Sequence, residues 1–270
     1  MAVERLNLKE EGMADILSNE HWLRYEAVAP LVKGKIVLDI ACGSGYGTDY
    51  LAKNGAKEII GCDIDKNSIT KSQFCYQAPN LKFQTADALK LPFENGKFDL
   101  IVSLETIEHF SADKQSVLLQ EFKRVLKEDG TLIVSTPNSL ASREKNPWHL
   151  KELNKEELKN LLKEKFLYSR IYEQGSAMAT FIKGAQESHF RISSVFQAKY
   201  YLALASDREL TNELPSLASL NPLALAAKEN HPLMKIIDKI YCRLNKLSFF
   251  TQIFKSFSER TLKREAGKRE

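Results

Sequence analysis

The 270-residue sequence contains few cysteines, no long apolar run and little excess charge. Its four cysteines show no Cys-x-x-Cys spacing and no paired histidine pattern, which disfavours a zinc site or a disulfide framework and favours reduced thiols. No stretch reaches the roughly 18 apolar residues of a membrane span, and residues 1–11 lack the apolar core of a signal peptide. A formal charge of +4 does not by itself indicate nucleic acid. We therefore expect a cytoplasmic protein with neither a metal ion nor a nucleic-acid partner.

The first 170 residues alternate between strand and helix patterns. Short apolar runs bounded by turn residues are typical of buried parallel strands, and they occur at residues 35–40, 58–62, 81–85, 98–103 and 131–135. Segments with helical spacing occur at residues 46–53, 69–76 and 115–126 and after residue 154. The expected helix boundaries are Asn67 or Ser68, Asp129-Gly130, and a capping box of Asn154 with Glu157. This repetition predicts an α/β fold with a Rossmann-like, doubly wound, mostly parallel sheet.

The pattern changes at about residue 185. We expect a first domain over residues 1–184 and a mostly helical extension over residues 185–270, with helices at 190–205 and 233–257. Residues 228–270 carry 11 Lys/Arg and 5 Asp/Glu, and apolar residues recur among them at helical spacing. Such a helix can bind an anionic membrane surface, here the inner membrane face, or pack on its own domain or on a second copy in a homodimer.

A glycine-rich turn follows the first predicted strand. The strand carries Asp39 near its end, and residues 40–47 read Ile-Ala-Cys-Gly-Ser-Gly-Tyr-Gly before a helix. Glycines at a strand-to-helix turn let the backbone approach a ligand closely, and a helix N-terminus favours negative charge. Asp63 ends the second strand about 20 residues later, where a carboxylate can accept both ribose hydroxyls. The turn therefore predicts an adenosine-derived ligand.

The residues around this turn narrow the choice of ligand. A dinucleotide fingerprint needs glycine at position 48, which is Thr48, and no Gly-Lys-Ser/Thr follows as a P-loop would require. An acid just before the glycines suits a ligand that carries an amino group, such as the methionine end of S-adenosylmethionine. Taken alone, Asp39 could instead cap the following turn or helix.

With these residues, the sequence resembles the class I S-adenosylmethionine-dependent methyltransferases. The resemblance covers roughly residues 20–170 and consists of five motifs in order, at residues 37–45, 61–64, 85–93, 98–109 and 124–130. It implies S-adenosylmethionine as the cofactor, a seven-stranded sheet, Asp63 on the ribose, Ile64 against the adenine and Asp87 at the adenine amino group. The implied cofactor residues are Asp39, Ala41, Gly43, Gly45, Tyr46, Asp63, Ile64, Asp87, Ala88, Leu89, Ser103 and Leu104.

Some residues of these motifs have a second interpretation. Ala41 stands where glycine is common in the family, a departure that adds one methyl group. Asp87 could be a turn acid, and Glu108 with His109 could close the fourth strand without taking part in chemistry.

Residues 21–26, 32–35 and 146–153, with the Ala-Cys-Gly-x-Gly-Tyr-Gly turn, resemble methyltransferases of bacterial surface-polysaccharide and glycolipid assembly. This resemblance implies an O-methyltransferase that acts on a hydroxyl, phosphoryl or phosphoramidate oxygen of a small polar molecule or glycan precursor in capsule or lipopolysaccharide biosynthesis. An unrelated small metabolite as acceptor, and a non-catalytic cofactor-binding module, are the alternatives. Nucleic-acid methylation is disfavoured, because no Asn-Pro-Pro-Tyr-like or catalytic cysteine motif is present.

Methyl transfer from a sulfonium depends mainly on alignment of the reacting atoms, and a hydroxyl acceptor near neutral pH also benefits from a general base. His149 is the first candidate base, because it lies in the loop after the fifth strand, where ligands of open sheets gather. A loop histidine bonded to backbone is the alternative, and His109 is the second candidate base. The expected substrate contacts are Arg24, Tyr25, Glu105, Asn138 and Glu152, with His21 on the same N-terminal helix and His189 and Arg191 in the extension.

Overall fold

The structure is a computed structural model, which describes residues 14–141, 146–175, 179–183, 188–192, 198–211 and 214. For residues 14–19, 179–183 and 188–192 it describes the backbone alone. The helix expected at residues 233–257, and with it the expected membrane or dimer contact, lies outside the described residues. Across the described part of the chain, no helix is both long enough and apolar enough to cross a membrane.

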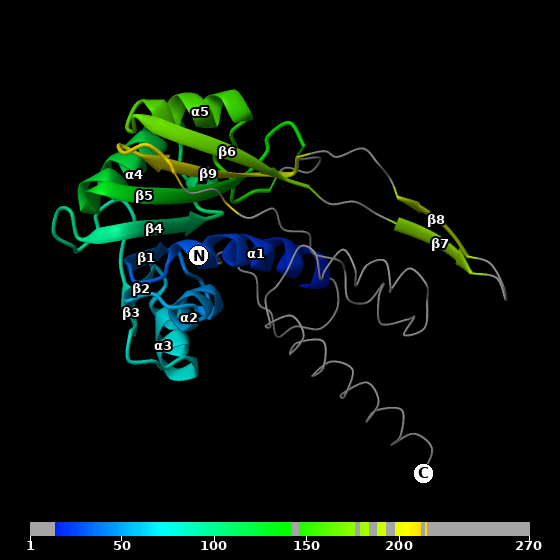
Figure 1. The fold of residues 1–270 in the computed structure, drawn as a ribbon. Helices are drawn as coiled ribbons and strands as arrows, with labels where there is room; N and C mark the ends of the chain where they lie inside the picture. Colours follow the sequence, from blue (N-terminus) through cyan, green and yellow to red (C-terminus); the bar gives the residue numbers. More distant parts are fainter. Residues whose placement is uncertain are drawn as a thin grey trace, which may run out of the picture.

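A seven-stranded sheet forms the centre of the described part, in the order β3-β2-β1-β4-β5-β9-β6 (Figure 1). The strands are β1 (Ile36–Ile40), β2 (Glu58–Asp63), β3 (Leu81–Thr85), β4 (Phe98–Leu104), β5 (Leu126–Pro137), β6 (Tyr168–Gln174) and β9 (Tyr200–Ser206). Strands β1 to β5 pair in parallel, and β9 runs antiparallel to both β5 and β6. The expected seven-stranded, mostly parallel sheet is confirmed, with one antiparallel strand inserted.

Helices cover both faces of this sheet, as a doubly wound fold requires (Figure 1). The helices are α1 (Ala14–Val28), α2 (Tyr46–Lys53) and α3 (Lys66–Cys75) on one face, and α4 (Ala112–Val125) and α5 (Lys155–Lys163) on the other. Adjacent residues of β1 divide between the two hydrophobic clusters, because Val37 packs with α1–α3 and Leu38 packs with α4 and α5. Side chains that alternate across a strand produce this division.

The helix caps agree with the sequence at one helix and differ at another. The capping box of Asn154 and Glu157 is confirmed at the start of α5. The N-cap of α3 is Asp65 rather than Asn67 or Ser68. The Asp65 carboxylate accepts from the backbone amides of Asn67 at 3.3 Å and Ser68 at 3.0 Å, so those residues belong to the first turn that the cap closes.

Two expectations about the order of elements are wrong. The Asp129-Gly130 pair does not end a helix, because α4 already ends at Val125 and the pair lies inside β5. Two strands replace the helix expected at residues 190–205. One is β8 (Ser188–Ile192), which pairs with β7 (Ala179–Lys183) in a separate two-stranded sheet, and the other is β9. His189 and Arg191 lie on β8, where the backbone alone is described.

The error at β9 has a physical reason. Residues 201–206 are all buried, because β9 lies between β5 and β6 with helices on both faces of the sheet. A short, wholly apolar run is compatible with a buried strand and with a buried helix, and its periodicity does not separate the two. The central sheet therefore extends past residue 184, where the sequence placed the boundary of the first domain.

Candidate functional site

The carboxyl ends of β1, β2 and β4 meet at one edge of the sheet, here called the carboxyl edge. Because β1 lies between β2 and β4, the direction in which successive strands are added reverses at this point, and ligands of open α/β sheets bind at such a switch point. Asp39 is the penultimate residue of β1, Asp63 ends β2 and Leu104 ends β4. The fold thus brings predicted cofactor residues from three strands to one edge.

Asp39 is almost completely buried, with 1% of its surface exposed. The Thr48 hydroxyl donates to its Oδ2 at 2.6 Å, and the Tyr25 hydroxyl donates to the same oxygen at 3.3 Å. Burial raises the pKa of Asp39 to about 7; the two hydroxyl donors oppose this rise and the charge of Asp63 adds to it. A buried carboxylate of this kind is stabilised by a cationic neighbour, such as the amino group of a methionine moiety.

Thr48 and Tyr25 have positions that the sequence did not predict. Thr48 was noted only because it replaces a glycine, yet its hydroxyl is the closest hydrogen-bond donor of Asp39. Tyr25, an expected substrate contact, lies beside the glycine-rich turn, where a Cβ atom on Gly47 would approach the ring carbon Cζ to 2.0 Å. Packing against Tyr25 therefore requires glycine at position 47.

The backbone of the turn is left-handed at Ala41, Gly43 and Gly45, with φ angles of 58°, 55° and 79°. Gly45 has a second constraint, because a Cβ atom there would lie 2.6 Å from the Ser72 hydroxyl. The alanine at position 41 does more than add a methyl group, since a left-handed alanine carries about 1–2 kcal/mol of strain that glycine avoids. Ala41 is exposed, so the cause of the strain is its backbone conformation.

Asp63 joins the glycine-rich turn to the end of β2. The Gly43 amide donates to its Oδ2 at 2.9 Å, and the Asp65 amide donates to its Oδ1 at 2.9 Å. These bonds fix the orientation of the carboxylate at the carboxyl edge. The next residue, Ile64, is 67% exposed and offers an apolar surface there. Both placements fit the expected ribose and adenine roles, which stay predictions.

The remaining predicted cofactor residues follow β3 and end β4. Asp87 is exposed, and its Oδ1 accepts from the Leu89 amide at 2.9 Å, which is the turn arrangement that the sequence left open as an alternative. Ala88 is buried and Leu89 half-buried. Ser103 and Leu104 are buried, and among the described residues the Ser103 hydroxyl has no hydrogen-bond partner. Their contacts with the cofactor stay predictions.

Aromatic side chains hold α1 against the helix that follows the turn. The Tyr46 hydroxyl hydrogen-bonds with Nδ1 of His21, and the rings of Trp22 and Tyr46 stack with centroids 5.6 Å apart. Trp22 also contacts Tyr50, at 4.9 Å between centroids. Burial, with the nearby Arg24 charge, lowers the pKa of His21 to about 3, so this histidine stays neutral at neutral pH. The helix α1 therefore covers the start of α2 through a neutral interface.

Arg24 and Asn138, two expected substrate contacts, are occupied by groups of the chain itself. Arg24 is 4% exposed; its Nη1 donates to Gln174 at 2.7 Å and its guanidinium lies 4.5 Å from the centre of the Tyr200 ring. The Asn138 side chain donates to the Ala198 carbonyl at 2.8 Å and accepts from the Leu140 amide at 3.0 Å. These contacts join the N-terminal helix and the loop after β5 to the β6–β9 part of the sheet.

A polar cluster follows β4 at the same carboxyl edge. The short helix η2 (Ile107–His109) comes directly after this strand, and the carbonyl of Glu108 accepts from the amides of Leu150 at 2.8 Å and Lys151 at 3.1 Å. These bonds hold the loop that carries His149 against η2. The rings of His109 and His149 lie 5.1 Å apart. The two candidate bases of the sequence are thus brought together from separate loops.

Glu152 and Glu108 complete this cluster. Nδ1 of His149 lies 2.6 Å from Oε1 of Glu152, so the expected substrate contact Glu152 instead orients the candidate base. Glu108 is fully buried, and among the described residues neither of its carboxylate oxygens has a hydrogen bond of normal geometry, although the Thr136 side chain lies close enough to oppose part of the rise in its pKa. Burial raises the pKa of Glu108 well above its usual range, and the charge of Glu105 raises it further.

Glu105, the fifth expected substrate contact, lies between the cofactor residues and this cluster. It is half-buried, has a left-handed φ of 53° and accepts from the Ser135 hydroxyl at 2.6 Å. Nη2 of Arg24 lies 3.8 Å from Oε2 of Glu105. The sequence missed Glu108 as a functional candidate because an acid at a strand end has an ordinary structural role. The consecutive Glu108 and His109, with a histidine after the next strand, are the signal that could have identified it.

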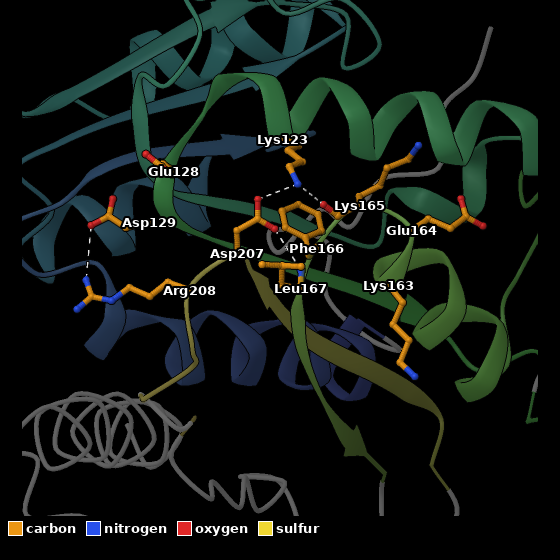
Figure 2. Close-up of a pocket in the computed structure, with 10 residues that line it drawn as sticks. All are labelled: Lys123, Glu128, Asp129, Lys163, Glu164, Lys165, Phe166, Leu167, Asp207 and Arg208. Atoms are coloured by element: carbon orange, nitrogen blue, oxygen red, sulfur yellow. Dashed lines mark hydrogen bonds and ion pairs between the residues drawn. The ribbon is translucent and has the colours of Figure 1, made fainter.

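Figure 2 shows a different hollow, of about 870 Å³, at the opposite edge of the sheet. It lies where α4 ends, β6 begins and β9 ends. Four of its eight charged side chains form ion pairs, because Lys123 pairs with Asp207 at 2.7 Å and Arg208 with Asp129 at 3.7 Å. Ligands of this type of sheet bind at the carboxyl ends of the strands, so we assign the functional site to the carboxyl edge.

Comparisons with known proteins indicate which family and fold the chain resembles. Residues 38–134 match the family model described as a methyltransferase domain. A protein named "Probable S-adenosylmethionine-dependent methyltransferase" from Mycobacterium tuberculosis is 32% identical over 163 residues, which cover 57% of this chain and 58% of that protein. A protein of the same name from Mycolicibacterium smegmatis is 31% identical over 163 residues, covering 57% of this chain and 62% of that protein. The match therefore spans about three fifths of the length of these curated relatives.

A solved structure shows the same fold. The S-adenosylmethionine-dependent methyltransferase from Mesorhizobium loti superposes with a TM-score of 0.52 at 15% identity, over 69% of this chain and 97% of that chain. The glycine-rich turn, the buried Asp39 and the oriented Asp63 also suit an adenosyl ligand with an amino group. Residues 38–134 therefore match a methyltransferase domain, the sheet around them has the fold of a solved methyltransferase, and the named relatives indicate S-adenosylmethionine as the cofactor.

Proposed function

We propose that the protein transfers the methyl group of S-adenosylmethionine to an oxygen atom of a small polar acceptor. When bound, the cofactor supplies an electrophilic methyl carbon, to which the acceptor oxygen bonds as the carbon–sulfur bond breaks and the sulfur keeps the electron pair. Asp39 would hold the amino group of the cofactor and Asp63 its ribose, which together aim the methyl group toward the acceptor. The observation that carries the proposal is the histidine and carboxylate cluster at the edge that holds these two acids.

The orientation of His149 suits activation of an acceptor hydroxyl. A carboxylate oxygen can only accept, so the bond to Glu152 requires the proton on Nδ1 of His149 and leaves Nε2 as its basic atom. A hydroxyl must lose its proton as its oxygen is methylated, and a basic nitrogen or a bound cation at this position assists that loss. An ionised phosphoryl oxygen would need positioning alone.

A sugar-containing precursor of bacterial polysaccharide is the acceptor class that we favour. Support comes from the resemblance of residues 21–26 and 146–153 and from Trp148, which is 42% exposed and whose backbone carbonyl lies 3.0 Å from Nδ1 of His109. The apolar face of an indole packs well against the carbon–hydrogen face of a sugar ring, while polar groups nearby bind its hydroxyls. A nucleic acid is disfavoured as acceptor, because the sequence shows no basic residues interleaved with stacking aromatic residues.

The excess of basic residues at positions 228–270 supports a location at a membrane surface. Residues 228–270 carry 11 Lys/Arg and 5 Asp/Glu, and this composition favours the cytoplasmic face of a membrane that displays a lipid-linked precursor. Flotation of the full chain with anionic vesicles, compared with neutral vesicles, tests this location. Equal and negligible flotation with both would contradict it.

Two measurements test the proposed function. S-adenosylmethionine should raise the melting temperature of the protein, because a ligand that binds only the folded state stabilises it, and Asp63→Ala should remove most of that rise. Release of S-adenosylhomocysteine should then be measured with nucleotide sugars, phosphorylated sugars and phosphoramidates. Binding without release on every acceptor class would support a non-catalytic cofactor-binding module, and release with an unrelated metabolite alone would contradict the sugar acceptor.

A further inference from the structure

Glu108, His109 and His149 form a cluster whose geometry suits a cation. One ligand atom from each residue lies within 4.8 Å of those of the other two. A tetrahedral ion with bonds of about 2.1 Å would hold such atoms about 3.4 Å apart. The two imidazole rings stand edge to face with centroids 5.1 Å apart, so an ion would have to draw the ligand atoms together by up to about 1.4 Å. The three groups reach one point from η2 and from the loop after β5.

Both histidines present a nitrogen lone pair. Nδ1 of His109 lies 3.0 Å from the carbonyl oxygen of Trp148, and Nδ1 of His149 lies 2.6 Å from Oε1 of Glu152. Because these oxygens only accept, each Nδ1 carries a proton, so Nε2 is the atom of each ring that can offer a lone pair to an ion. Metal-bound histidines commonly donate their other nitrogen to a carbonyl or carboxylate in this way. The Asn146 amide, 3.2 Å from Nε2 of His149, would turn aside for an ion.

Glu108 supplies an independent indication of a ligand. It is fully buried, and within the described residues neither carboxylate oxygen has a hydrogen bond of normal geometry; Thr136 is the nearest side-chain donor. Buried carboxylates in proteins are normally paired, hydrogen-bonded or bound to a metal, because an uncompensated buried charge is strongly destabilising. The backbone carbonyl of Glu108 is held by two amides, and one carboxylate oxygen lies within 4.8 Å of a ring nitrogen of each histidine.

We propose that Glu108, His109 and His149 bind a divalent transition-metal ion, such as Zn²⁺, Mn²⁺ or Co²⁺, whose open positions hold the acceptor oxygen. Two imidazole nitrogens and one carboxylate favour these ions over Mg²⁺ or Ca²⁺, which prefer oxygen ligands. Three protein ligands leave at least one position for an acceptor hydroxyl or phosphoryl oxygen. A bound cation makes a hydroxyl more acidic, so its proton passes to water as the oxygen takes the methyl group. This role rests on the proposed methyl transfer; metal binding itself does not.

Metal binding is tested without activity. Full-length protein, freed of metal with a chelator that is then removed, is titrated with Co²⁺ and Mn²⁺ by calorimetry and, for Co²⁺, by visible absorption. We expect one equivalent to bind, with affinity reduced at least 100-fold in Glu108→Gln and in His149→Asn. Glu152→Gln, which removes the charge that orients His149, should weaken binding about 10- to 100-fold. Glu128→Gln, exposed at the opposite edge of the sheet, is the matched control and should bind as the original chain does.

Each variant is accepted only if its melting temperature and its affinity for S-adenosylmethionine stay close to those of the original chain, which separates lost ligands from lost folding. No saturable binding of one equivalent, or unchanged binding in His149→Asn, would overturn the metal site. Undiminished release of S-adenosylhomocysteine by chelator-treated protein would overturn its role in holding the acceptor, with His149 then acting directly as a base. Metal binding with no methyl transfer to any acceptor would instead overturn the proposed function and leave the site standing.

Discussion

The buried carboxylate of Asp39 makes the stability of the cofactor-free protein depend on pH. Its pKa is about 7 in the fold and about 3.9 in an unfolded chain. The folded state therefore holds this proton more tightly, and ionisation of Asp39 destabilises the fold progressively as pH rises from the unfolded value to the folded value. Replacement by asparagine removes the ionisation and keeps the shape of the side chain.

The size of the effect follows from the two pKa values. At pH 5 Asp39 is protonated in the fold while most unfolded chains are ionised, and at pH 8 both states are largely ionised. Proton linkage then predicts that the stability of Asp39→Asn relative to the original chain increases by about 2–3 kcal/mol between pH 5 and pH 8. Other buried groups with raised pKa values, such as Glu26 and Glu108, are present in both proteins and cancel in the difference.

Urea unfolding followed by circular dichroism at both pH values, without cofactor, measures this difference. Asp129→Asn, at an exposed site, is the matched control and should show no comparable change with pH. Asp39→Asn should also bind S-adenosylmethionine at least 10-fold more weakly, since it would lack the charge that we propose faces the amino group of the cofactor. The burial of an ionisable Asp39 would be refuted if the difference in unfolding free energy between Asp39→Asn and the original chain stayed constant from pH 5 to pH 8. It would also be refuted if the original chain gained stability over the variant as the pH rose.

Two further predictions concern the glycine-rich turn. Ala41→Gly should stabilise the protein by about 0.5–1 kcal/mol in urea unfolding, because glycine adopts the φ of 58° without strain; a loss of stability would contradict this explanation. Gly47→Ala should destabilise it by about 1–3 kcal/mol, because its Cβ would approach the Tyr25 ring to 2.0 Å. The same substitution in a Tyr25→Ala background should have less than half that effect, and an equal effect in both backgrounds would rule out the collision.

The cofactor could be predicted mainly from residues that lie near one another in the sequence. The turn at residues 40–47 and the acid that ends β2 belong to consecutive strand–helix units, whose parallel pairing fixes their relation in space. The same local logic located β1 to β4 and the capping box of α5. It failed at β9, where an apolar run buried on both faces has no period that distinguishes a strand from a helix.

The sequence by itself determined the glycine-rich turn and the acids of the carboxyl edge, because they lie in one local motif and in strands whose order follows from chain connectivity. Only the tertiary structure decided what surrounds that edge. In the structure, the hydroxyls of Thr48 and Tyr25 hydrogen-bond to Asp39. Arg24 and Asn138 bind other groups of the chain, and β9 lies between β5 and β6. The fold also brought His149 to Glu108 and His109 from a loop some 40 positions away. Contacts across such separations depend on packing of the whole sheet, which no local pattern encodes.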